Sequence, residues 1–89
     1  MRAVYVEWID SETINLGGWS VIKEINYEIH VCVTVGWLVK EDGESILVAS
    51  NISAERDQCS CACVIPKVSI VRRLYVAVPK GKVKYVRAR

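Results

Sequence analysis

A run of alternating apolar residues between positions 29 and 39 constrains the fold of this chain more than any other feature. One face of the run would carry Ile29, Val31, Val33, Val35, Trp37 and Val39. The other face would carry His30, Cys32, Thr34, Gly36 and Leu38. Successive side chains of a β-strand point to opposite faces, so an apolar residue at every second position is typical of a strand. The run therefore predicts a long strand in a β-rich domain.

Shorter segments with strand character, separated by turn residues, flank this run. The predicted strands cover residues 2–9, 29–39, 45–50, 59–65, 70–78 and 83–88. Asp42 and Gly43 predict a tight hairpin turn between the second and third strands. Pro66 cannot donate a hydrogen bond to a strand neighbour, and it predicts one 3₁₀ turn over Pro66 to Ser69 before the chain re-enters the sheet.

Six short antiparallel strands make a sheet too narrow for a sandwich, and closing the sheet on itself would bury both apolar faces. We therefore predict an all-β fold, a small and strongly curled antiparallel barrel, with residues 1–89 forming a single domain. The stretch 64–74 resembles the strand, 3₁₀ turn and strand that close Src-homology-3-like barrels. The long loop after the first strand fits that strand order or the related Sm-like order.

Composition excludes several classes of protein. With 52% hydrophobic and 25% charged residues, the chain is too apolar to remain disordered. It has no run of about 20 apolar residues, the length that a transmembrane helix needs, so no membrane association is expected. The first ten residues include Glu7 and Asp10 and lack the pattern of a secretory signal. These features predict a cytoplasmic protein.

The charge is distributed unevenly along the chain although the net charge is only +2. Residues 1–66 hold all ten acids and four of the bases, whereas residues 67–89 hold the other eight bases and no acid. Such a segment could meet an anionic ligand, pair with the acidic part of a neighbouring subunit, or simply protect an edge strand from aggregation.

The cysteines and the single histidine give no strong sign of metal or catalytic chemistry. Cys59, Cys61 and Cys63 would share one strand face too far apart for an unstrained disulfide, and with Cys32 they are predicted to be reduced. Zinc sites usually take paired ligands from two loops, and this pattern is missing, so core positions are favoured over metal ligands. His30 has no evident acid or nucleophile beside it. We predict no metal, no cofactor and no enzymatic activity.

Aromatic and basic residues together suggest a ligand site. Aromatic faces stack on nucleobases, and arginine and lysine side chains bind phosphate. Trp8 and Trp37 are expected to be mainly structural, whereas Trp19 lies in the longest loop and could act as a lid or an interface anchor. Gly36, in mid-strand, suggests a bulge or the close approach of a ligand or another backbone. The predicted ligand-binding residues are Trp19, Trp37, Lys67, Arg72 and Arg73.

Several short motifs resemble, in order and spacing, a widespread group of small phage-encoded proteins of mostly uncharacterised function. These motifs are Trp8-Ile9-Asp10-Ser11, Gly18-Trp19, Val35-Gly36-Trp37-Leu38-Val39, Val48-Ala49-Ser50 and Ile65-Pro66-Lys67 with Ile70. The group is similar to phage anti-defence sponges of the anti-CBASS type, which sequester nucleotide immune signals and commonly form homo-oligomers that enclose cyclic nucleotides between subunits. The cysteine triplet and the basic extension after Val78 depart from that pattern, and no role is carried over to them.

The resemblance implies a non-enzymatic phage protein that sequesters a small anionic ligand, a (cyclic) nucleotide immune signal, as a homo-oligomer in the host cytoplasm. Two alternatives stay open. The first is an adaptor that binds a host protein or peptide as Src-homology-3-like modules do. The second is an Sm-like nucleic-acid binder, which the modest net charge disfavours.

Overall fold

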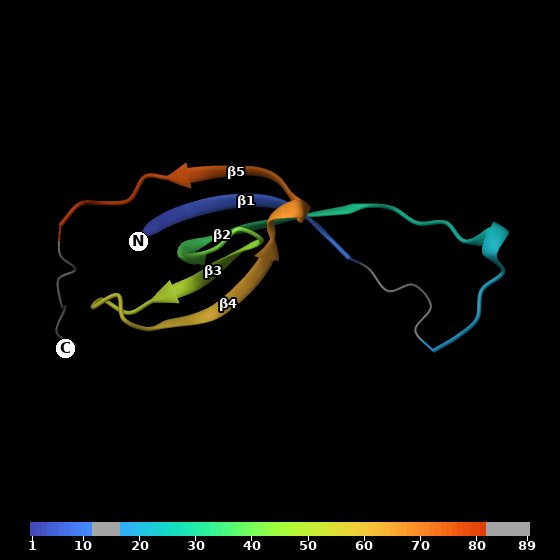
Figure 1. Ribbon diagram of the computed structural model, residues 1–89, viewed down its shortest axis with the longest axis horizontal. Helices are drawn as coiled ribbons and strands as arrows, with labels where there is room; N and C mark the ends of the chain where they lie inside the picture. Colours follow the sequence, from blue (N-terminus) through green and yellow to red (C-terminus); the bar gives the residue numbers. More distant parts are fainter. Residues whose placement is uncertain (12–16, 82–89) are drawn as a thin grey trace, which may run out of the picture.

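The computed structural model describes residues 1–11 and 17–81, which form one five-stranded antiparallel sheet (Figure 1). The strands are β1 (Arg2–Asp10), β2 (His30–Glu41), β3 (Ser45–Ile52), β4 (Cys59–Pro66) and β5 (Ile70–Val76). Two short 3₁₀ turns, η1 (Ile22–Glu24) and η2 (Lys67–Ser69), complete the elements. The spatial order is β4-β3-β2-β1-β5, so β1 pairs with both β2 and β5. The all-β, antiparallel prediction is confirmed.

The turn between β2 and β3 is held by Asp42, as its sequence predicts. One carboxylate oxygen of Asp42 accepts hydrogen bonds from the backbone N–H groups of Glu44 and Ser45, each at 2.8 Å. The N–H of Asp42 donates to the carbonyl of Ser45 at 3.0 Å. The two backbone hydrogen bonds to the carboxylate lower the pKa of Asp42, so this side chain holds the turn in its ionised form.

The predicted 3₁₀ turn after Pro66 is confirmed as η2. The N–H of Lys67 donates to the carbonyl of Glu44 at 2.7 Å, which joins η2 to the β2–β3 turn. The chain thereby crosses from β4 at one edge of the sheet to β5 at the other edge (Figure 1).

One face of the sheet carries the core. The largest fully buried side chains are Val4, Val6, Ile46, Val48 and Ile65, with Trp8, Leu38, Cys63 and Ile70 packed against them. The indole N–H of Trp8 donates to the Thr34 hydroxyl at 2.9 Å, which satisfies the polar atom of this largely structural tryptophan.

Gly36 occupies a position where no larger residue fits without movement. A Cβ atom there would overlap the carbonyl oxygen of Ala49 and lie 2.9 Å from Cγ1 of Val48. The predicted close approach at Gly36 is therefore an approach of the β3 backbone to β2.

The prediction of a closed barrel with about six strands is wrong. The described residues form five strands in a sheet whose edge strands, β4 and β5, do not pair with each other; the expected strand at 83–88 lies outside the described residues. The β1–β2 ladder runs on to Asp10 and His30, whereas β3 pairs with β2 only from Trp37 and β5 pairs with β1 only as far as Trp8. A two-stranded ribbon therefore extends beyond the sheet instead of curling back to close it.

The end of this ribbon and residues 17–29 extend away from the sheet (Figure 1). We call residues 17–29 the arm. The radius of gyration is 18.1 Å, against about 12 Å for a compact domain of this length. No helix among the described residues is long and apolar enough to cross a membrane.

Candidate functional site

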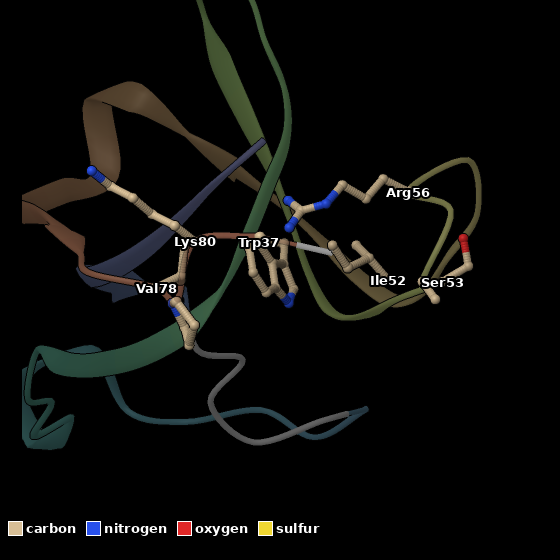
Figure 2. Close-up of a pocket in the computed structure, with 9 residues that line it drawn as sticks. Trp37, Ile52, Ser53, Arg56, Val78 and Lys80 are labelled. Atoms are coloured by element: carbon tan, nitrogen blue, oxygen red, sulfur yellow. The ribbon is translucent and has the colours of Figure 1, made fainter. Parts of the chain in front are cut away.

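A hollow of about 390 Å³ lies beside Trp37, between the β3–β4 loop and the segment that follows β5. Its lining consists of Trp37, Ile52, Ser53, Ala54, Arg56, Val78, Pro79, Lys80 and Gly81. The guanidinium carbon of Arg56 lies 5.4 Å from the centre of the indole ring. Figure 2 shows Arg56 reaching toward Trp37 from the loop, with Val78 and Lys80 on the other side of the indole. The hollow thus offers an aromatic face and a fixed cation.

The β3–β4 loop positions Arg56 through hydrogen bonds centred on Ser53. The Ser53 hydroxyl donates to the Asp57 carboxylate at 2.8 Å and accepts from the N–H groups of Asp57 and Gln58, each at 3.2 Å. The N–H of Arg56 donates to the carbonyl of Ser53 at 2.9 Å. These bonds hold the loop in one conformation and direct the Arg56 side chain over β2.

Arg56 itself adopts a left-handed backbone conformation, with φ of 63°. For a residue other than glycine, this backbone conformation costs about 1–2 kcal/mol. Backbone strain of this kind concentrates at functional sites, where the surrounding structure keeps it in place. The strained residue here is the one whose cation faces the indole.

Two of the predicted phosphate-binding cations lie on Glu41 rather than at this hollow. Nζ of Lys67 is 2.8 Å from one carboxylate oxygen of Glu41. Arg73 donates to both oxygens, at 3.1 and 3.2 Å. The hydrogen bonds from Arg73, and then from Lys67, lower the pKa of Glu41 to about 2. Both cations therefore share one carboxylate that stays ionised at neutral pH.

The third predicted cation, Arg72, is engaged in the same way by Glu7. Its Nε and Nη2 donate to the two oxygens of Glu7 at 3.1 and 2.9 Å. The Tyr5 hydroxyl donates to the same carboxylate at 2.7 Å. Hydrogen bonds from Arg72, and then from Tyr5, lower the pKa of Glu7, and the bond to Glu7 raises the pKa of Tyr5. This arrangement crosses from β5 to β1 and ties the two strands together.

The two predicted aromatic residues lie in different parts of the chain. Trp37 lines the hollow on the sheet, whereas Trp19 lies on the arm and is fully exposed. Trp19 borders a shallow hollow on the arm with Ser20, Val21, Glu24, Ile25 and Asn26. Among the five predicted ligand-binding residues, only Trp37 therefore lines the hollow on the sheet, between the β3–β4 loop and the segment after β5.

The cysteines do not contribute to this site. All four are free, and Cys63 packs against the core while Cys59 and Cys61 are exposed. In the part of the chain that the structure describes, no group of three or more histidine, cysteine or acidic side chains could hold a metal ion.

Arg56 and Lys80, which line the hollow, were not predicted from the sequence. Each lies in a polar or turn segment, and its distance from Trp37 along the chain gives no sign of contact. One usable signal was present, since the loop containing Arg56 follows the strand that pairs with Trp37 in a hairpin. No protein-family model, curated protein or solved structure matches the chain. What this site does must therefore be argued from its own residues.

Proposed function

We propose that the protein is a non-enzymatic binding protein that sequesters a small anionic ligand with an aromatic ring, a (cyclic) nucleotide, at the Trp37 hollow. The observation that carries this proposal is the guanidinium of Arg56 held 5.4 Å from the Trp37 ring centre in a hollow of about 390 Å³. Small-molecule sites in proteins span about 300–1,000 Å³ and combine an apolar lining with a few fixed polar groups.

The aromatic ring and the negative charge of the proposed ligand each have a partner in this hollow. A nucleobase stacks on an indole face, a contact worth about 1–3 kcal/mol. The Arg56 guanidinium can stack on the other side of the base or bind a phosphate with two parallel hydrogen bonds. Lys80 adds a second positive charge at the rim. Sequestration needs tight binding and no reactive group, which agrees with a site that has a cation and an aromatic ring but no paired acid and base.

The fit of the hollow favours this function over the two alternatives. Grooves that bind proline-rich peptides are lined by several aromatic side chains, whereas Trp37 is the only aromatic side chain among the described residues that line this hollow. Nucleic-acid binding relies on many uncompensated cations, whereas Arg72 is paired with Glu7, and Lys67 and Arg73 share Glu41. The phage resemblance, the homo-oligomer and the host cytoplasm as the site of action belong to the same proposal.

Titration calorimetry against a panel of cyclic di- and trinucleotides tests the proposal. We expect one or more members to bind the wild-type chain, Trp37→Ala to lose about 10-fold or more in affinity, and Arg56→Ala to lose a similar factor, as expected for 1–3 kcal/mol per contact. Lys40→Ala, which removes an exposed cation of β2 that does not line the hollow, is the matched control and should bind as the wild type does. Absence of binding by every nucleotide, or unchanged affinity in Trp37→Ala, overturns the proposal.

A further inference from the structure

Two apolar surfaces of the described chain have no cover. The first is on the arm, where Trp19 is 100% exposed, Ile22 88% and Tyr27 77%. The second is the sheet face opposite the core, which we call the open face. It consists of Ile9, Val31, Val33, Val35, Leu74 and Val76, each 40% exposed or more.

The strand registers place the residues of the open face on one continuous surface. Val35 faces Tyr5 across the β1–β2 ladder, and Tyr5 faces Leu74 across the β1–β5 ladder. In the same way Val31 faces Ile9, and Ala3 faces Val76. Residues directly opposite each other in antiparallel strands project from the same side of the sheet. The open face therefore runs across β2, β1 and β5, with the Glu7–Arg72 ion pair lying on it beside Val33.

The accessible surface of the chain exceeds that of a typical folded monomer of the same mass, as expected for a chain that covers part of its surface with a partner. The accessible surface is 7711 Å², whereas folded monomers of 10.0 kDa expose roughly 5,200 Å². The excess, roughly 2,500 Å², is larger than the roughly 800 Å² that each partner buries in a standard interface. An isolated two-stranded ribbon is also only marginally stable in water, and the two pairs of the β1–β2 ladder beyond β5 place Ile9 beside the exposed Val31.

The arm cannot cover the open face of its own chain in this structure, because it extends away from the sheet (Figure 1). The charges of the sequence indicate what the arm would meet instead. The arm carries two acids, Glu24 and Glu28, and one base, Lys23, whereas from Lys80 onward the chain carries five bases and no acid. An apolar, acidic arm thus matches a surface that is apolar and is followed by a basic segment, and the open face ends at β5, which leads into that segment.

We infer that the arm of one copy docks on the open face of a second copy, and that two copies exchange arms around a two-fold axis. Reciprocal exchange makes both contacts at once and closes the assembly. Trp19, Ile22 and Tyr27 of one copy cover the valines of β2 and the apolar residues of β5 of the other. The inference specifies the homo-oligomer of the proposed function, and it holds whatever ligand the Trp37 hollow takes.

The molar mass in solution, measured by light scattering without any nucleotide, tests this inference. We expect about 20 kDa, twice the 10.0 kDa of one chain. The arm variant Trp19→Ser/Ile22→Ser and the face variant Leu74→Glu should each run as single chains. Val68→Ser is the matched control, because Val68 is 96% exposed on η2 and lies outside both surfaces; it should keep the wild-type mass.

Mixing the two defective variants separates lost docking from misfolding. The arm variant retains an intact open face and the face variant retains an intact arm, so an equimolar mixture should regain one of the two contacts and form 1:1 pairs. A wild-type chain of 10.0 kDa at every concentration, a Val68→Ser control that dissociates as fully as the variants, or a mixture that does not associate contradicts the inference. Because no nucleotide is present, none of these outcomes bears on ligand binding at Trp37.

Discussion

Strand β3 and the first half of β2 carry similar alternating apolar residues, yet the structure treats them differently. Ile46 and Val48 of β3 are almost completely buried, whereas Val31 and Val33 of β2 are each 56% exposed. β3 has neighbours on both sides from Ile46 to Ala49, and its apolar face lies on the core. The first half of β2 has only β1 beside it. Alternation therefore specifies a strand, but the side of the sheet on which its apolar face lies decides whether that face is covered within the chain.

The largest difference between the two regions should appear in alanine variants. Ile65→Ala removes a fully buried side chain from the core and should lower the free energy of unfolding by about 2–5 kcal/mol. Val33→Ala, at a protein concentration where copies are separated, should change it by less than about 0.5 kcal/mol. Urea denaturation followed by circular dichroism measures both. Equal losses would mean that the two regions are covered alike.

The contact between β2 and β3 marks the boundary between the two regions, and Gly36 controls it. Gly36→Ala should lower the free energy of unfolding by about 1–3 kcal/mol, because the added Cβ overlaps the Ala49 carbonyl and approaches Val48. Gly43→Ala is the control, since nothing lies within 4 Å of a Cβ there. The same denaturation experiment compares them, and a loss in the control as large as that in Gly36→Ala would refute the close-approach explanation.

Two substitutions of Arg56 should have a smaller effect on stability. Comparing them separates the backbone strain at this residue from its part in ligand binding. Arg56→Gly removes the cation and relieves the left-handed strain, whereas Arg56→Ala removes the cation and keeps it. Relief of 1–2 kcal/mol, partly offset by the backbone entropy of glycine, should leave the glycine variant about 1 kcal/mol more stable than the alanine variant. Both should lose nucleotide affinity equally in calorimetry. Better binding by Arg56→Gly than by Arg56→Ala would show that the loop conformation, not the cation, matters.

The smallest effect concerns pH. Hydrogen bonds from Arg73 and Lys67 lower the pKa of Glu41 from 4.5 to about 2 in the folded chain. Its stabilising contribution is therefore fully present above pH 4.5 and is lost as the pH falls from 4.5 toward 2. Urea midpoints at pH 7 and pH 3 should differ less in Glu41→Gln than in the wild type. An unchanged pH dependence in the variant would assign the acid sensitivity to other carboxylates.

The positions of the strands were largely predictable because their signals are local. The alternation over 29–39 corresponds to β2 (His30–Glu41), the Asp42-Gly43 signature corresponds to the β2–β3 turn, and Pro66 marks the 3₁₀ turn η2. Closure of the sheet was not predictable in the same way. It depends on where ladders end, and the extension of the β1–β2 ladder to Asp10 and His30 leaves no signal in the alternation of either strand.

The candidate site was predictable only in part. Trp37 was identified by its residue type, but its cation comes from a loop that approaches it only after β3 has paired with β2. The charges of Lys67, Arg72 and Arg73 were visible in the sequence, whereas the carboxylates that compensate them come from β1 and β2, far away along the chain. Whether a cluster of cations is available to bind an anionic ligand depends on such long-range ion pairs, which composition cannot show.

The comparison between the two regions leads to one claim, that the core region is covered by its own chain and the arm and open face by a second copy. Amide hydrogen exchange at a series of protein concentrations tests it most directly. The account predicts that protection of residues 17–35 rises with concentration while protection of residues 45–66 stays constant. Rapid exchange of residues 17–35 at every concentration, or protection that does not change with concentration in either region, would contradict it.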